Sequence, residues 1–139
     1  MKRVLFRIAS VLIVLLDLGH TSGYPWSDPA WGVDPHVLQA AHFNVLGSNR
    51  TYWDFYVGFG LSISVLLLLP ALIAWQLGAP EARQFRGMAW LLVVLFAAIT
   101  ILDCVFFFVI PIAFSGAITL CLAAAAISSP SKAISPGAR

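Results

Sequence analysis

A single apolar block covering residues 87–127 is the feature that most restricts how this chain can fold. About 20 apolar residues suffice to cross the hydrocarbon core of a bilayer as a helix. A block of about 41 residues is therefore too long for one span and right for two with almost no loop. Pro111 lies near its middle, and proline interrupts a helix because it has no backbone N–H to donate. We expect spans at residues 87–109 and 112–128, with the chain reversing at Pro111.

Two further apolar stretches precede this block. Residues 55–77 are long enough for a span. Residues 4–19 are short for one, and with their Lys-Arg flank they also fit a secretory signal, whose cleavage is the alternative. Because Asp17 interrupts the part that stays apolar in a signal, we expect this stretch to be retained as the first span. The expected fold class is all-α, a four-span transmembrane helix bundle forming one membrane domain over residues 1–139, with a loose tail at residues 129–139.

The composition identifies lipid as the solvent for much of the surface. Hydrophobic residues make up 60% of the 139 residues and charged residues 10%, where an average soluble domain carries about 25% charged residues. No basic stripe could follow a phosphate backbone, which argues against nucleic acid as a partner. His36 and His42 are spaced so that they fall on different faces of a helix, and we expect no metal and no cofactor. Cys104 and Cys121 are expected to be small, buried thiols.

The cationic residues fall almost entirely on one side of this expected bundle. Lys and Arg accumulate in the cytoplasmic loops of membrane proteins. With the N-terminus inside, Arg50 is external and the remaining cations are cytoplasmic, namely Lys2, Arg3, Arg7, Arg83, Arg86, Lys132 and Arg139. The interfacial aromatic residues agree with this orientation: Trp26, Trp31, Tyr52, Trp53 and Tyr56 outside, Trp75 and Trp90 inside. We therefore expect a protein integral to the plasma (inner) membrane, with both termini cytoplasmic and residues 20–53 as an external cap.

The external segment is expected to contain one short helix. Residues 23–35 are rich in Pro, Gly, Trp and Asp and are typical of an irregular loop. Asp34 then offers an N-cap and Pro35 a proline at the first helical position, while Gly47 ends the apolar pattern that follows. We expect an interfacial helix of about 11 residues in between.

Every histidine and nearly every acidic residue lie toward the outer end of the expected bundle, and only Glu81 is clearly inside. Asp103 is about two helical turns before Pro111 and hence roughly 10 Å below the outer surface. A charge at the centre of a span costs about 2.5 to 3.5 kcal/mol, so Asp103 should face the bundle and find a partner or stay protonated. The residues that could converge on a polar cluster or ligand-binding site at the outer bundle mouth are Asp17, His20, Arg50, Asp54 and Asp103.

This polar cluster admits one structural and two functional interpretations. In a structural lock, Arg50 would bond to Asp17 or Asp103, with the histidines capping helices or lying at the interface. In a proton or cation site, Asp17, His20 and Asp103 would supply the ligands. In an enzyme, an acid and base pair would act on a lipid-soluble substrate, with Asp103 or His42 as the catalytic proton donor.

The second span also carries a helix-packing pattern. Small residues spaced four apart let another helix approach closely. The pattern is made by Gly58, Gly60, Ser62 and Ser64. We expect it to serve packing within the monomer, with a dimer face as the alternative.

Three resemblances bear on architecture. The run from Arg50 to Gly60, RTYWDFYVGFG, is similar to a stretch of uncharacterised four-helix bacterial inner-membrane proteins, which implies the architecture and no activity. His42 and Asn44 resemble the His-x-Asn piece of the membrane-associated eicosanoid and glutathione metabolism family, but the Glu that follows there is missing and the motif of that family faces the cytoplasm. Asp17 is similar to the acidic residue in the first span of small multidrug transporters, although theirs lies mid-membrane.

These features favour a small integral membrane protein of non-enzymatic type that contacts membrane lipid and acts as a subunit or binding module for a lipid-soluble ligand. A membrane-embedded enzyme acting on a hydrophobic substrate is the alternative. A proton-coupled carrier is a second alternative, disfavoured because no ionisable residue lies within the inner half of the bilayer. A homo-oligomer or a larger membrane complex is compatible with the same features.

Overall fold

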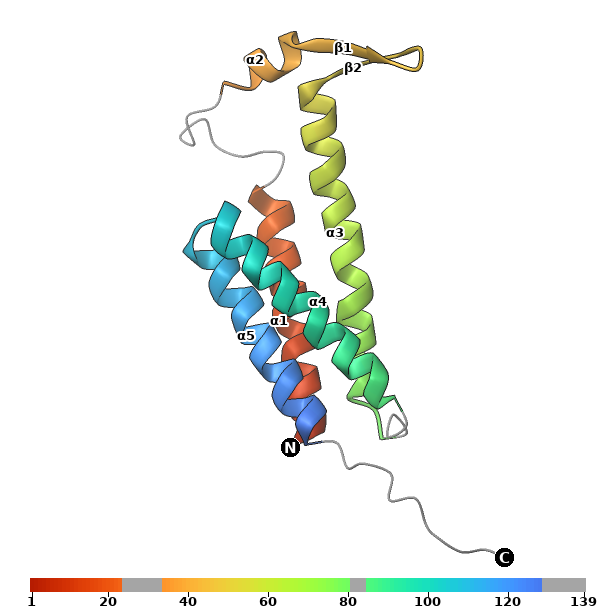
Figure 1. The fold of residues 1–139 in the computed structure, drawn as a ribbon, viewed down its shortest axis with the longest axis vertical. Helices are drawn as coiled ribbons and strands as arrows, with labels where there is room; N and C mark the ends of the chain where they lie inside the picture. The colour runs from red at the N-terminus through yellow and green to blue at the C-terminus, as the bar shows by residue number, and fades with distance from the viewer. Residues whose placement is uncertain (24–33, 81–84, 129–139) are drawn as a thin grey trace, which may run out of the picture.

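The computed structural model describes residues 1–23, 34–80 and 85–128. In this part of the chain four long helices run alternately in opposite directions (Figure 1). They are α1 (Lys2–Gly23), α3 (Tyr52–Leu77), α4 (Arg86–Phe106) and α5 (Val109–Ile127). Each is long and apolar enough to cross a membrane. The predicted all-α, four-helix membrane bundle is confirmed.

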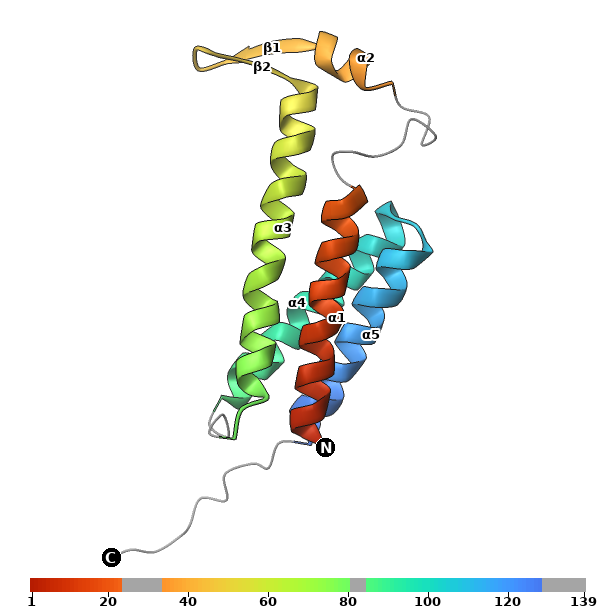
Figure 2. The ribbon, with the colours of Figure 1, turned by 180° about the vertical axis from the view of Figure 1, so that it is seen from behind.

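Helix α1 is the central helix of the bundle. It packs against α3 on one side and α5 on the other, and α4 packs along α5 (Figure 2). Helices α3 and α4 follow each other in the chain but contact each other only sparsely. The first residue of α1 and the last turn of α5 lie at one end of the bundle, which we call the N-terminal end (Figure 1). The opposite end carries a small β-hairpin above α3, and we call it the hairpin end.

The chain reverses between α4 and α5 at Phe107 and Phe108, both of which have extended backbone. The expectation that it reverses at Pro111 is therefore wrong. Pro111 lies in the first turn of α5, where a missing N–H leaves no helical hydrogen bond unmade, so proline is tolerated there. As a consequence, Asp103 lies within one turn of the end of α4 instead of two turns before the reversal.

The segment before α3 begins with the expected helix but ends differently. Helix α2 (Pro35–Ala40) has Asp34 as its N-cap, whose Oδ1 accepts a hydrogen bond of 2.9 Å from the backbone N–H of His36. The helix has 6 residues, so the expected length of about 11 is wrong. The remaining residues form strands β1 (His42–Val45) and β2 (Ser48–Thr51), which pair antiparallel.

A two-residue turn connects the two strands. Leu46 and Gly47 both have positive φ, 52° and 81°, which suits a tight hairpin turn and not a helix. The side-chain oxygen of Asn44 accepts a bond of 3.2 Å from the N–H of Gly47 and supports the turn. Phe43 packs its ring against Tyr52 and Phe55 at the start of α3, with ring centroids 5.3 and 5.0 Å apart. The hairpin therefore packs against the first turn of α3.

The two halves of the bundle have different interiors. In the N-terminal half the buried side chains form an apolar core, made by Phe6, Ala9, Ile13, Leu67, Ala71, Ala74, Leu77, Ala89, Leu92, Phe96, Ile118, Leu122, Ala125 and Ala126. In the hairpin-end half of the long helices, the described residues that are buried are Asp17, Gly60, Asp103 and Ser115. The chain thus buries polar groups where an apolar core would be expected to continue.

Candidate functional site: a polar layer in the hairpin-end half of the bundle

Polar side chains of all four long helices lie between the middle of the bundle and its hairpin end. We call this set the polar layer, and its members are Asp17, His20, Thr21, Ser64, Thr100, Asp103, Ser115 and Thr119. Asp17 and His20 come from the last turns of α1, and Asp103 comes from the last turn of α4.

Asp17 is linked to α3 through a chain of hydroxyl groups. Its side chain is only 7% exposed. The hydroxyl of Thr21, one turn further along α1, donates to Asp17 Oδ1 at 3.3 Å. The same hydroxyl lies 2.7 Å from Ser64 Oγ on α3. A single carboxylate oxygen is thus bonded to one hydroxyl, which leaves acceptor capacity on a buried carboxyl group.

His20 and Gly60 form a second link between α1 and α3. The Nε2 atom of His20 lies 3.0 Å from the backbone carbonyl oxygen of Gly60 and donates to it, because a carbonyl oxygen only accepts. Gly60 is buried, and the lack of a side chain there lets α1 come close to the α3 backbone. The hydroxyl oxygen of Ser64 also lies 3.4 Å from the same carbonyl oxygen.

Asp103 is the most unusual member of the polar layer. It is 7% exposed, and within the described residues its carboxylate has no hydrogen-bond or ion-pair partner. The backbone carbonyl of Asp103 accepts a hydrogen bond of 2.9 Å from the N–H of Phe107. Phe107 is the C-cap of α4. A buried polar group without a partner is rare in proteins, because its desolvation is not compensated. The Asp103 carboxylate is therefore the group in this bundle that most needs a ligand or a proton.

Hydroxyl groups join α4 to α5 next to Asp103. Thr100 Oγ1 lies 3.2 Å from Thr119 Oγ1 and donates 2.7 Å to the backbone carbonyl of Phe96. Ser115 is fully buried, and its hydroxyl donates to the carbonyl of Ile112 at 3.4 Å. Each hydroxyl satisfies its donor on the backbone or on another hydroxyl, so the neighbourhood adds polarity without adding positive charge.

The remaining residues of the predicted polar cluster lie outside the bundle interior. Asp54 and Thr51 form a capping box at the start of α3, with bonds of 2.8 and 3.1 Å. Arg50 is exposed on β2 and donates to the carbonyl of Asn49 at 3.2 Å. The structure thus brings Asp17 and His20 together on α1, places Asp103 at the same end of the bundle, and leaves Arg50 and Asp54 on the surface. In the described ranges, no ion pair joins Arg50 to either buried aspartate.

The other predicted features are placed as follows. His42 is exposed on β1, above α3, whereas the end of α4 that carries Asp103 lies beside α5 (Figure 1). Cys121 is half-buried, but Cys104 is exposed on the outward face of α4, so the expectation that both thiols are buried is wrong for Cys104. Several residues lie outside the described ranges, namely Trp26, Trp31, Glu81, Arg83, Lys132 and Arg139.

The small residues of α3 occupy two different faces. Gly60 and Ser64 face α1 through the contacts given above. Gly58 and Ser62 are exposed, and the Ser62 hydroxyl donates 2.7 Å back to the carbonyl of Gly58. A methyl group added at Gly58 would meet no atom within 4 Å. One pair of the four therefore packs within the bundle, and the other pair faces outward.

Sequence reasoning found the two buried aspartates but missed most of the hydroxyl groups around them. The missed residues are Thr21, Thr100, Ser115 and Thr119. The spacing of two of them indicates that they lie near the aspartates. Thr21 follows Asp17 by one helical turn, and Thr100 precedes Asp103 by nearly one turn. Hydroxyl residues one turn from an intramembrane acid belong to the same helix face.

In comparisons with known proteins, no family model, curated protein or solved structure matches the chain. The class of protein is nevertheless defined by its fold. It is a small membrane protein with four apolar helices.

Proposed function

We propose that this protein is a non-enzymatic binding module of the membrane, and that its polar layer holds the polar head of a lipid-soluble ligand. The observation that carries the proposal is the buried Asp103 carboxylate, which has no partner among the described residues. A binding site for an amphiphile needs a few polar groups in an otherwise apolar surrounding, and the hairpin-end half of the bundle has this composition.

The chemistry of the polar layer selects the kind of head group. Asp17 and Asp103 are acidic, and the described cations, Lys2, Arg3, Arg7, Arg50 and Arg86, make no bond to either. Hydroxyl groups fill the surrounding positions and can accept as well as donate. The favoured ligand therefore carries an ammonium group or another strong hydrogen-bond donor on an apolar body.

The arrangement supports binding over transport or catalysis. A proton-coupled carrier needs polar groups leading to both faces of the membrane. In the described N-terminal half, the buried polar side chain is that of Ser10, and its hydroxyl already donates 2.7 Å to the carbonyl of Ala71. An enzyme would need Asp103 paired with a second titrating group, and His42 lies on a different element at the surface.

We further propose that the hairpin end faces the outside of a plasma (inner) membrane. Among the described cations, Lys2, Arg3, Arg7 and Arg86 lie in the first turns of α1 and α4, at the N-terminal end. Arg50 lies on the hairpin at the other end. The excess of Lys and Arg on the cytoplasmic side of membrane proteins supports this orientation.

Three amphiphiles with the same chain test the proposed site. Dodecylamine, dodecanol and dodecanoate differ only in the charge and donors of the head group. Added to the protein in a neutral maltoside detergent, dodecylamine should raise the unfolding temperature by several degrees more than dodecanol, because it binds the folded state. Dodecanoate should give the smallest effect, since its charge repels the two aspartates.

Matched variants connect the effect to the polar layer. Asp103→Asn and Asp17→Asn should each remove most of the difference between dodecylamine and dodecanol. Asp34→Asn makes the same change at an exposed cap, where asparagine caps equally well, and should leave the difference intact. Equal stabilisation by all three amphiphiles, or a difference that survives in Asp103→Asn, would contradict the proposal.

A further inference from the structure

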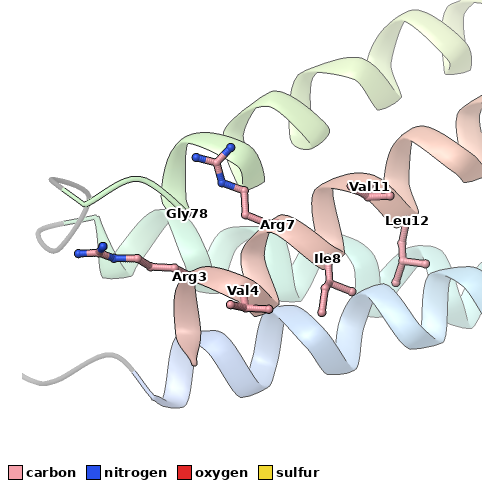
Figure 3. A pocket seen from close by; sticks show the side chains of 7 residues that line it. All are labelled: Arg3, Val4, Arg7, Ile8, Val11, Leu12 and Gly78. Carbon is pink, nitrogen blue, oxygen red and sulfur yellow. The ribbon is translucent and has the colours of Figure 1, made fainter.

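A groove runs along α1 at the N-terminal end of the bundle, far from the polar layer. It has a volume of about 440 Å³. Its lining residues are Arg3, Val4, Arg7, Ile8, Val11, Leu12 and Gly78. Figure 3 shows the Arg3 side chain extending toward the end of the bundle and the Arg7 side chain extending toward α3, while Val4, Ile8 and Leu12 point away from Arg7 in this view. The lining is therefore mostly apolar, and its two arginines lie toward the beginning of α1.

The two arginines carry positive charge that no described acidic residue balances. They are one helical turn apart, and in the described part of the chain neither has an acidic partner. The guanidinium carbon of Arg7 lies 3.5 Å from the centroid of the Trp75 ring. Because the N–H donors of a guanidinium lie in its plane, stacking one face on a ring fixes the group and leaves its edge available to phosphate oxygens.

Gly78 sets the position of Arg7. It is the C-cap of α3 and lies against the arginine side chain. A Cβ atom at this position would come within 2.8 Å of Arg7 Nε, which is closer than real contacts allow. The glycine thus makes room for the guanidinium between α1 and α3. Its φ of −75° is open to any residue, so the close contact, and not the backbone, favours glycine here.

The apolar lining continues away from the arginines toward the middle of the bundle. Val4, Ile8 and Val11 are exposed in the groove, and Leu15 and Leu18 extend the same face of α1. At 1.5 Å per residue, the stripe from Val4 to Leu18 is roughly 20 Å long. This length and direction suit a hydrocarbon chain that runs from a head group at the membrane surface into the bilayer.

We propose that this groove binds one anionic phospholipid of the adjoining leaflet, with its phosphate on Arg3 and Arg7 and an acyl chain along the α1 stripe. Charge complementarity selects the head group, since basic pockets at the cytoplasmic ends of spans bind anionic lipids. The proposal does not rest on the polar layer, which lies in the other half of the bundle.

Phosphatidylglycerol and phosphatidylcholine with identical acyl chains test this site. The protein is titrated with each lipid in neutral maltoside micelles, and bound lipid is counted by native mass spectrometry. We expect phosphatidylglycerol to bind about tenfold more tightly than phosphatidylcholine. Glycerol 3-phosphate, which has the phosphate without the chains, should not compete at millimolar concentration. Equal affinity for the two lipids, or full competition by glycerol 3-phosphate, would overturn the proposal.

Variants separate a specific site from general attraction to cations. Arg3→Gln with Arg7→Gln should abolish the preference for phosphatidylglycerol. Arg86→Gln removes a cation from the same end of the bundle but outside the groove, and should retain it. An equal loss in Arg86→Gln would mean diffuse electrostatics and would overturn the proposal.

Gly78→Ala tests the geometry without changing any charge. Its added methyl group displaces Arg7, so the preference for phosphatidylglycerol should fall severalfold. The unfolding temperature of each variant in lipid-free micelles confirms that it is folded. Should the double variant fail to fold, Gly78→Ala and the single variant Arg3→Gln carry the test, and an unchanged preference in both would overturn the proposal.

Discussion

The guanidinium group of Arg7 stacks on the ring of Trp75, with 3.5 Å between the guanidinium carbon and the ring centroid, and so joins the beginning of α1 to the end of α3. A cation–π contact contributes about 0.5 to 1 kcal/mol at an exposed site and about 2 kcal/mol when it is desolvated. Trp75→Leu should therefore lower the free energy of unfolding in detergent by about 1 kcal/mol, because Trp75 is half exposed. Trp90→Leu is the control, since Trp90 has similar exposure on α4 and stacks on no described cation. Equal losses in the two variants would contradict a specific role for the stacking.

The short contact between Thr21 and Ser64 predicts a measurable coupling between α1 and α3. Their hydroxyl oxygens are 2.7 Å apart. Hydrogen bonds between membrane helices contribute about 0.6 kcal/mol on average, with a maximum of about 1.7 kcal/mol. A double-mutant cycle with Thr21→Val and Ser64→Ala should give a coupling energy in this range. The cycle of Thr21→Val with Ser62→Ala should give none, because the Ser62 hydroxyl bonds within α3.

The four helices could be predicted because hydropathy is a property of whole segments. Each span needs only a long run of apolar side chains, and the residues that interrupt these runs are few. The position of the turn at Phe107 and Phe108 could not be predicted in the same way. Proline is the strongest local signal, but Pro111 is compatible with the first turn of a helix, and nothing in a run of phenylalanines indicates a reversal.

The hairpin and the polar layer depend on contacts between distant residues. Leu46 is a poor residue for a turn with positive φ, so the pattern lacked the usual Asn-Gly or Asp-Gly signal. The aspartates were recognisable as intramembrane acids, but their surroundings were not. The hydroxyls of Ser64 and Thr119 reach the layer because α3 packs on α1 and α5 packs on α4, and helix pairing cannot be derived from hydropathy.

The hairpin turn should become more stable when its first residue is changed. Leu46 is fully exposed with φ of 52°, a conformation that asparagine adopts more readily than leucine. Leu46→Asn should therefore slow amide hydrogen exchange in residues 42–51, with a gain of about 0.5 kcal/mol. Gly47→Ala should have the opposite effect, since its φ is 81°. Exchange that is insensitive to both changes would show that the turn does not control the hairpin.

The distribution of cations predicts the orientation of the bundle. A reporter fused after residue 139 should read cytoplasmic, and one inserted after Gly47 should read external. Replacing Lys2 and Arg3 with glutamine should weaken this bias and yield a mixed population, because both lie at the start of the first span. An external signal from the C-terminal fusion would reverse the proposed orientation while leaving the packing of the helices unaffected.

Asp103 distinguishes a structural lock from a binding site by its effect on stability. Removing one partner of a buried ion pair costs about 3 to 5 kcal/mol, because the other charge is left uncompensated. The Asp103 carboxylate has no partner within the described residues, so Asp103→Asn should leave the free energy of unfolding unchanged or raise it. Chemical unfolding in lipid-free micelles measures this difference, with Asp17→Asn as a comparison that retains an acceptor for Thr21. A loss of several kcal/mol in Asp103→Asn would identify the carboxylate as part of the scaffold, and the ligand would have to be sought elsewhere in the bundle.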